Sequence, residues 1–103
     1  MKRVLSFPQL LPIRKFVIQE KSMEPTYYQG DTVLVYSWFN IFKKNDIIVF
    51  ADQKTEKTFI KRIKQINEGE ILVEGDNKNM SIDSRHFGPI KMEQIIGRVI
   101  AKL

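Results

Sequence analysis

Apolar residues along the chain occur in short runs that alternate with polar residues or stay unbroken for four residues, with turn residues between them. These runs predict strands at residues 16–19, 32–36, 47–50, 58–66, 71–74 and 95–101. The unbroken run at residues 47–50 predicts a strand that is buried on both faces. No stretch of a dozen residues has a strong helical period, and one helical turn at residues 37–42 is the only helix expected. We therefore expect a mainly β fold, either a coiled antiparallel sheet or a small barrel.

The chain length indicates one domain. A chain of 103 residues has room for a single hydrophobic core. Residues 1–15 read as an N-terminal arm, because Pro8 and Pro12 interrupt its apolar run, and residues 16–103 read as the folded domain. A membrane-spanning helix needs roughly 20 apolar residues in succession, and no such stretch is found. We expect no transmembrane helix.

Composition narrows the possible chemistry. The chain has no cysteine and one histidine, so the usual nitrogen and sulfur ligands of a metal site are missing, and we expect neither a metal nor another cofactor. The formal charge of +5 suits nucleic acid, an anionic membrane or an acidic protein, but a solvated lysine-rich surface explains it as well. We expect no nucleic-acid partner. The aromatic residues near Lys43-Lys44 either cap the core or touch a lipid surface: Trp38, Phe39 and Phe42.

Ser22 is a candidate nucleophile. It precedes Pro25 in Lys21-Ser22-Met23-Glu24-Pro25-Thr26, where the proline restricts the backbone and favours a turn after a strand. Such a turn can present a hydroxyl to a groove. A serine in this setting is also an ordinary turn former.

Lys61 is a candidate general base. Alternation along a strand places Phe59, Lys61 and Ile63 on one face, so the lysine has apolar neighbours. Desolvation lowers the pKa of a lysine from about 10.4, and only the neutral amine can accept a proton. The alternative is a lysine that reaches over these neighbours to water. A triad built from Asp83 and His86 is a weak alternative, and His86 is expected at the surface.

The segment from Gly75 to Pro89 reads as an ordered loop. Asp83 and Arg85 can form a charge-assisted pair, and Ser81 can hydrogen-bond a lysine amine.

Together these motifs resemble the signal peptidase I family of Ser/Lys proteases. The resemblance covers most of the chain from Phe16 onward, in the order of the family's motifs: Ser22-Met23-Glu24-Pro25-Thr26, Gly30-Asp31-Thr32, Asn45-Asp46, Ile60-Lys61-Arg62, Gly75-Asp76-Asn77, Ser81-Ile82-Asp83-Ser84-Arg85-His86-Phe87-Gly88 and Ile96-Gly97-Arg98. It implies the β core shared by signal peptidases and LexA, with an extended precursor polypeptide as substrate.

The resemblance also implies residue roles. Ser22 is the expected nucleophile and its backbone N–H an oxyanion donor, Lys61 is the expected base, and Ser81 orients the lysine. Asp76, Asn77, Asp83 and Arg85 correspond to structural positions of the loop. Glu20 and Asn45 depart from the family pattern. A carboxylate at Glu20 opposes negative charge in the oxyanion hole, whereas Asn45 replaces a glycine and tolerates a positive φ.

The resemblance leaves the substrate open. Because no anchor is found in the sequence, we expect a cytoplasmic protease that removes an N-terminal leader, for which the segment Asp83 to Pro89 suggests a precursor such as nickel-type superoxide dismutase. The alternatives are a membrane-associated signal peptidase with an anchoring partner, a LexA-type self-cleaving regulator, and an inactive binding module of the same fold. A LexA-type cut is disfavoured because residues 1–21 contain neither Ala nor Gly.

Overall fold

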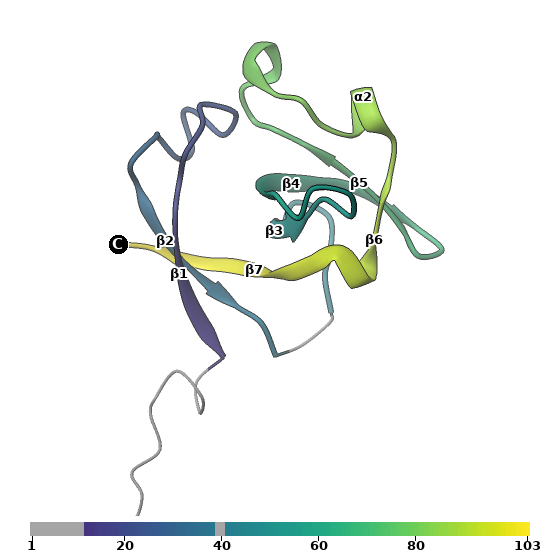
Figure 1. The fold of residues 1–103 in the computed structure, drawn as a ribbon, viewed down its shortest axis with the longest axis horizontal. Helices are drawn as coiled ribbons and strands as arrows, with labels where there is room; N and C mark the ends of the chain where they lie inside the picture. Colours follow the sequence, from purple (N-terminus) through teal and green to yellow (C-terminus); the bar gives the residue numbers. More distant parts are fainter. Residues whose placement is uncertain (1–11, 39–40) are drawn as a thin grey trace, which may run out of the picture.

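One antiparallel sheet dominates the computed structural model, which describes residues 12–38 and 41–103. Within these residues the sheet has seven strands in the order β1-β2-β7-β3-β4-β5-β6 (Figure 1). The strands are β1 (Ile13–Val17), β2 (Thr32–Tyr36), β3 (Ile47–Ala51), β4 (Thr58–Asn67), β5 (Glu70–Glu74), β6 (Ile90–Lys91) and β7 (Ile95–Lys102). A four-residue helix, α2 (Ser84–Phe87), and two 3-10 turns, η1 (Lys78–Met80) and η2 (Met92–Gln94), complete the chain.

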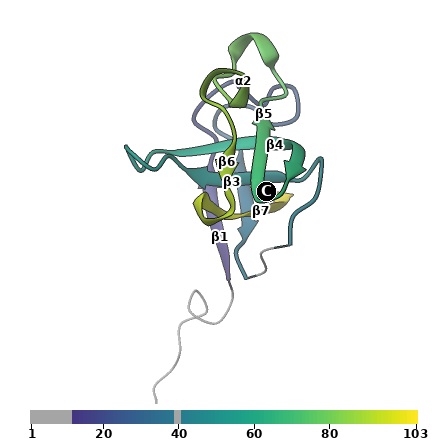
Figure 2. The same ribbon diagram turned by 90° about the vertical axis from the view of Figure 1, so that its right-hand side faces the viewer.

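The sheet is coiled and open. β1 and β2 cross the direction of β3 and β4, as Figures 1 and 2 show, and β1 and β6 form its two edges. The expected coiled antiparallel sheet is confirmed, but it does not close into a barrel. β7 lies between β2 and β3 and so joins β1 and β2 on one side to β3, β4, β5 and β6 on the other.

The core occupies both faces of β3. Ile48 and Phe50 belong to one buried cluster with Ile63, whereas Val49 belongs to a second cluster with Val33 and others. This follows from the alternation of side chains along a strand. The prediction from the unbroken apolar run at residues 47–50, a strand buried on both faces, is therefore confirmed.

The sequence-based strand boundaries agree with the structure to within one residue except at β1. β1 starts at Ile13, so residues 13–15, which the pattern assigned to the arm, pair with β2, and it ends at Val17, so residues 18 and 19, predicted as strand, lie outside it. Residues 1–11 lie outside the described residues. The helical turn expected at residues 37–42 is not seen at 37, 38, 41 and 42, and residues 39 and 40 are not described. The pattern also missed α2 and β6, because four and two residues carry too little periodicity to detect.

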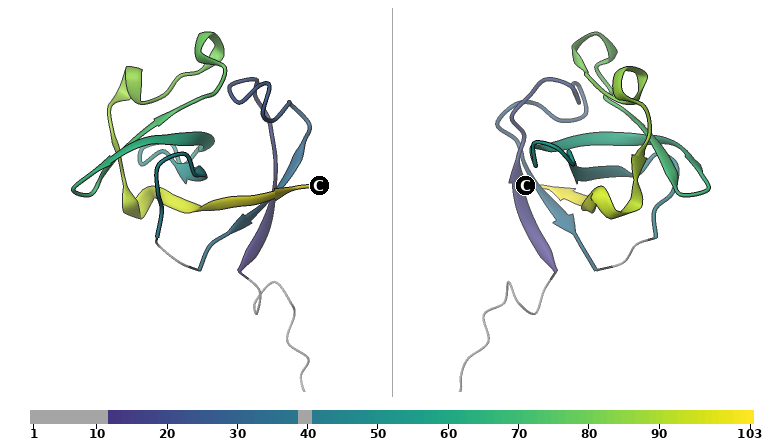
Figure 3. Two further views of the ribbon diagram at one scale, coloured as in Figure 1. Left: turned by 180° about the vertical axis from the view of Figure 1, so that it is seen from behind. Right: turned by 45° about the vertical axis from the view of Figure 1, so that its right-hand side comes forward.

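Two loops come together at one end of the molecule. The turn after β1 and the loop between β5 and α2 lie at the upper end of the views in Figures 1 and 3. A hydrogen bond of 2.8 Å from the Asn77 N–H to the Ser22 carbonyl joins them. This contact joins two loops through residues that are 55 positions apart in the sequence.

Candidate active site

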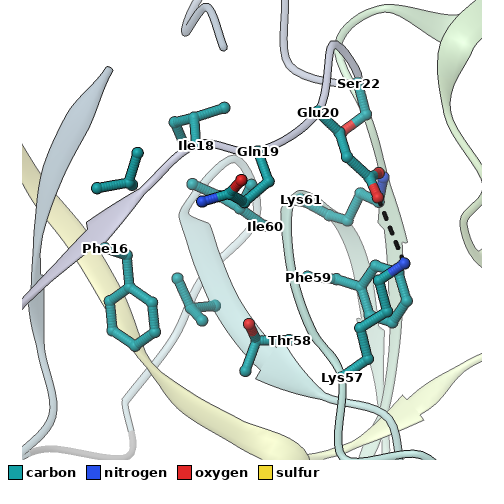
Figure 4. A pocket seen from close by; sticks show the side chains of 12 residues that line it. Phe16, Ile18, Gln19, Glu20, Ser22, Lys57, Thr58, Phe59, Ile60 and Lys61 are labelled. Atoms are coloured by element: carbon teal, nitrogen blue, oxygen red, sulfur yellow. Dashed lines mark ion pairs between the residues drawn. The ribbon is translucent and has the colours of Figure 1, made fainter. Parts of the chain in front are cut away.

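A cleft of about 190 Å³ lies between the segment that follows β1 and the beginning of β4. Its polar lining includes Ser22, Lys61, Glu20 and Lys57 (Figure 4). Its apolar lining includes Phe16, Ile18, Val49, Phe59 and Ile60. Two of the residues singled out in the sequence, Ser22 and Lys61, therefore share one cleft.

Lys61 is buried in an apolar part of β4. It is 1% exposed, and its cross-strand partner is Ile48 of the core. Burial lowers the pKa of Lys61 and outweighs the charges of Asp83 and Glu20, which act in the opposite direction, while the Arg85 charge adds to the lowering. Lys61 does not reach past its neighbours to water. The structure thus gives this amine the environment that favours its neutral form.

Ser81 connects Lys61 to a buried carboxylate. Its hydroxyl donates a hydrogen bond of 2.6 Å to Asp83 Oδ2, and the Lys61 amine donates one of 3.0 Å to Ser81 Oγ. A hydroxyl has a single hydrogen, and an ionised carboxylate can only accept. The Ser81 oxygen must therefore accept its hydrogen bond from Lys61. When the Lys61 amine is neutral, its lone pair is not used by Ser81 and can point toward another group.

Asp83 is held as a carboxylate by several donors. Arg85 Nε and Nη2 donate at 2.9 and 3.0 Å, and the Gly75 N–H donates at 2.9 Å. Burial alone raises the pKa of Asp83, but hydrogen bonds from Arg85, Ser81 and Gly75 outweigh it and hold this pKa far below its ordinary value. The expected pair between Asp83 and Arg85 is present. Asp83 is thus no proton acceptor for Lys61 near neutral pH.

Ser22 is held in place through its backbone. It is 2% exposed, and Met23 beside it is fully buried. Asn77 donates from its N–H to the Ser22 carbonyl and from Nδ2 to the Lys21 carbonyl, at 2.8 and 3.1 Å. Among the described residues, none accepts a hydrogen bond from the Ser22 N–H. This donor is available to a ligand in the cleft.

Asp76 ties the Ser22 turn to β4. Arg62 donates to both of its carboxylate oxygens at 2.8 Å, and Thr26 Oγ1 donates to Oδ2 at 2.5 Å. The Arg62 hydrogen bonds outweigh burial and lower the pKa of Asp76. Arg62 follows Lys61 directly, so the same strand carries the buried lysine and the anchor of the turn.

Gly75 contributes to the site, although the sequence shows it only as part of the motif Gly75-Asp76-Asn77. A Cβ at this position would overlap Ser81 Oγ and would lie 2.5 Å from the Ser22 carbonyl oxygen. The position therefore admits only glycine, as expected where two backbones approach closely. Its place between the Ser22 turn and Ser81 could be found only in three dimensions.

Glu20 and Asn45 are the two departures noted in the sequence. The Glu20 carboxylate pairs with Lys57 at 3.6 Å, as the dashed line in Figure 4 marks. Asn45 has a φ of 79°, which explains why it can stand in for glycine. Its N–H donates to the Ile63 carbonyl at 2.8 Å.

The remaining residues singled out in the sequence lie away from the cleft. His86 is exposed, and its Nδ1 accepts a hydrogen bond of 3.2 Å from the Asp83 N–H. Trp38 is 64% exposed, whereas Phe42 is half-buried against the core, and Phe39 is outside the described residues. Within the described ranges, no group of three or more potential ligand side chains is placed to hold a metal ion. No helix there is long and apolar enough to span a membrane.

Comparison with known proteins identifies the family. The family model described as Peptidase S24-like matches residues 14–100. The chain therefore belongs to the Peptidase S24-like family, and its relatives show that it is of the signal peptidase I kind.

Three relatives illustrate the likeness. Mitochondrial inner membrane protease subunit 2 of Schizosaccharomyces pombe is 28% identical over 97% of this chain and 69% of the relative. Subunit 2 of the same protease from Saccharomyces cerevisiae is 32% identical over 81% of this chain and 63% of the relative. Signal peptidase I U of Bacillus subtilis is 30% identical over 84% of this chain and 44% of the relative. The chain thus spans between about half and two thirds of these proteins.

Proposed function

We propose that the chain is a serine endopeptidase in which Ser22 is the nucleophile and Lys61 the general base. The observation that carries the proposal is the buried Lys61 amine, which donates to Ser81 and lines the same cleft as Ser22. A serine needs an adjacent base to become a nucleophile near neutral pH. Burial lowers the pKa of Lys61, and Lys61 lines the same cleft as Ser22, which supports this role for the lysine.

The first half of the reaction forms an acyl-enzyme. The neutral Lys61 amine takes the proton from Ser22 Oγ as that oxygen attacks the scissile carbonyl. The Ser22 N–H then donates to the carbonyl oxygen as it becomes negative, a kind of contact that lowers the barrier by about 3 kcal/mol. The C–N bond breaks when the Lys61 ammonium protonates the leaving amine, which leaves an ester on Ser22 and a neutral Lys61.

The second half returns the enzyme to its starting state. Lys61 takes a proton from a water molecule as that water attacks the ester carbonyl. The ester bond to Ser22 breaks, and the Lys61 ammonium returns the proton to Ser22 Oγ. Throughout both halves Ser81 accepts from Lys61, so that the lone pair of the amine stays directed away from Ser81.

The substrate is proposed to be a polypeptide in extended conformation. β1 is an edge strand, and residues 58–61 of β4 pair with β3 alone, since the pairing with β5 begins at Arg62. Unpaired strand edges on both walls of a cleft suit a chain that adds its own main-chain hydrogen bonds. The small apolar cleft favours short side chains beside the cut.

The cut is proposed to remove an N-terminal signal or leader peptide from a precursor. One candidate is a cytosolic precursor such as nickel-type superoxide dismutase, which rests on the sequence of the segment Asp83 to Pro89. A second candidate is an exported precursor processed at a membrane with an anchoring partner. The mitochondrial relatives, which are subunits of an inner membrane protease, and the exposed Trp38 support this second candidate.

Two other classes are less well supported. A LexA-type regulator is disfavoured because the relatives named above are an inner membrane protease subunit and a signal peptidase. An inactive binding module has no need for a buried lysine linked through Ser81 to Asp83, an arrangement that costs desolvation energy.

The test uses Ser22→Ala and Lys61→Met on a precursor peptide with a small residue before the cut. Both variants should lower kcat/KM by at least about a thousandfold. Lys64→Met, on the same strand, is the matched control and should retain activity. For the parent, kcat/KM should rise with pH through an apparent pKa well below 10. Activity that survives in the folded Ser22→Ala and Lys61→Met variants would exclude the dyad.

A further inference from the structure

An ion pair joins the two walls of the cleft. Glu20 belongs to the segment that carries Ser22, and Lys57 directly precedes β4, which carries Lys61. Their charged groups are 3.6 Å apart, with side chains that are 52% and 61% exposed. Figure 4 shows the Glu20 side chain extending toward Lys57.

Lys57 is held more firmly than a free surface lysine. Its carbonyl accepts a hydrogen bond of 2.8 Å from the Asp52 N–H at the end of β3. Its ammonium also lies 5.6 Å from the centre of the Phe59 ring, within the range of a cation–π contact. Lys57 therefore offers Glu20 a partner on the opposite wall whose main chain is anchored and whose ammonium also contacts the Phe59 ring.

The orientation of the Glu20 carboxylate, in contrast, depends on Lys57. Within the described part of the chain, Lys57 is its only ion-pair partner, and no hydrogen bond reaches its carboxylate. The charged groups that act on Lys61 are Asp83 and Arg85 from the loop, and Glu20 from the Ser22 segment. The charge of Asp83 is balanced by its ion pair with Arg85. Glu20 is therefore the carboxylate whose electrostatic effect on Lys61 and Ser22 changes when its side chain moves.

We propose that Lys57 is a positioning residue of the peptidase reaction, which holds the Glu20 carboxylate at the rim of the cleft and away from the oxyanion that forms beside the Ser22 N–H. This inference rests on the proposed function. Glu20 is two residues from Ser22, so its side chain can turn toward either Lys57 or the reacting carbonyl. The ion pair selects the first orientation.

Loss of Lys57 has two consequences that can be measured. An unpaired carboxylate near Ser22 repels the developing oxyanion, which slows the chemical step. The same carboxylate stabilises the Lys61 ammonium and so reduces the fraction of neutral amine at a given pH. Both effects act on kcat more than on KM, and both require Glu20.

The test compares Lys57→Met, Glu20→Gln and the double variant, with Lys54→Met as the control for loss of a nearby lysine. Lys57→Met should lower kcat by about three- to tenfold with little change in KM, and should move the midpoint of the pH–rate profile up by about half a unit. Glu20→Gln should move the midpoint down. The double variant should regain the kcat of the parent, and Lys54→Met should match the parent throughout.

Two outcomes would overturn the inference. Lys57→Met could behave like Lys54→Met, or the double variant could remain as slow as Lys57→Met, which would mean that Lys57 acts without Glu20. Either result leaves the proposed function intact as long as Ser22→Ala and Lys61→Met are inactive. Failure of the dyad itself would appear only in those two variants.

Discussion

At the scale of single residues, the site depends on which groups donate and which accept. Lys61 donates to Ser81, and Ser81 donates to Asp83. The hydrogen bonds thus all run in one direction and end at the Asp83 carboxylate. This carboxylate accepts five hydrogen bonds, from N–H or O–H groups of Arg85, Gly75 and Ser81. In the proposed reaction, a proton taken up by Lys61 therefore stays on Lys61 until the leaving group accepts it.

Replacement of Ser81 tests whether the hydrogen bond that Lys61 donates to Ser81 orients the lysine amine. In Ser81→Ala the amine of Lys61 loses its acceptor and can rotate, so we expect kcat to fall by about 10- to 100-fold with KM little changed. Ser81→Thr keeps the hydroxyl and should restore part of the loss. Steady-state kinetics on the same peptide measure both. A rise in KM with kcat unchanged would mean that Ser81 contacts the substrate instead.

Two carboxylates make the fold sensitive to acid. The pKa of Asp76 and that of Asp83 are both lower in the folded chain than in the unfolded one. Their contribution to stability is therefore complete above the unfolded value of about 3.9 and is lost as pH falls through the folded values. Urea unfolding should show a free energy of unfolding that drops below about pH 4.

Asp76→Asn should flatten this dependence and lower the free energy of unfolding at pH 7 by about 1 to 3 kcal/mol, because Arg62 loses a charged acceptor. Glu93→Gln, at an exposed position, is the control and should leave the acid response unchanged. An Asp76→Asn variant with the acid response of the parent would place the sensitivity elsewhere.

At the scale of elements, the site exists because the loop after β5 packs against the turn after β1. Asn77, Asp76 and Gly75 all contact residues 21–26 or lie against them. These contacts position Ser22 relative to β4, whereas the strands themselves position Lys61. The loop is therefore a structural part of the site and more than a connection between strands.

Gly75→Ala should disrupt this packing. The added methyl group overlaps Ser81 Oγ and the Ser22 carbonyl, so the two segments must separate. We expect a loss of about 1 to 3 kcal/mol in the free energy of unfolding and a larger proportional loss of activity. Gly69→Ala is the control for activity: its Cβ meets no neighbouring atom, but the φ of +86° is unfavourable for alanine, so this variant should lose stability without a matching loss of activity. Equal activity of the two variants would contradict the close approach.

Much of this arrangement follows from the sequence, but not all of it. The alternation around Lys61 predicted its apolar neighbours, and the unbroken run at residues 47–50 predicted the buried strand. The ion pair between Glu20 and Lys57 left no trace in the sequence, because neither residue has a pattern that reveals a partner 37 positions away. The sequence did not predict the early start of β1, because Arg14 and Lys15 break the apolar pattern there. Both side chains are exposed, and an edge strand accommodates such polar residues.

At the scale of the whole molecule, an apolar and basic surface lies away from the cleft. Trp38 and Ile41 are 64% and 79% exposed, and the exposed Lys43 and Lys44 follow them. Such a combination fits an anionic lipid surface, where each lysine contributes about 1 kcal/mol. Lys43 is paired with Asp46 at 3.1 Å, so Lys44 is the lysine whose charge is more open to lipid. We therefore expect this face to bind membranes peripherally.

The single tryptophan makes the prediction easy to measure. Vesicles that contain anionic lipid should shift the Trp38 emission to shorter wavelength, and neutral vesicles should not. Lys43→Gln combined with Lys44→Gln should weaken the effect and make it less sensitive to salt. Identical spectra with and without anionic vesicles would count against a membrane role for this face.

The position of β7 in the sheet has a consequence for how the chain is made. β7 follows every other strand in the sequence, yet it lies between β2 and β3 and joins the half that carries Ser22 to the half that carries Lys61. A ribosome delivers β7 after the other six described strands, so the pairing of β2 and β3 with β7 can form only after all of these strands have been made. Until β7 is made, β2 and β3 each keep one strand edge unpaired, so the growing chain exposes two open sheet edges that the finished sheet covers.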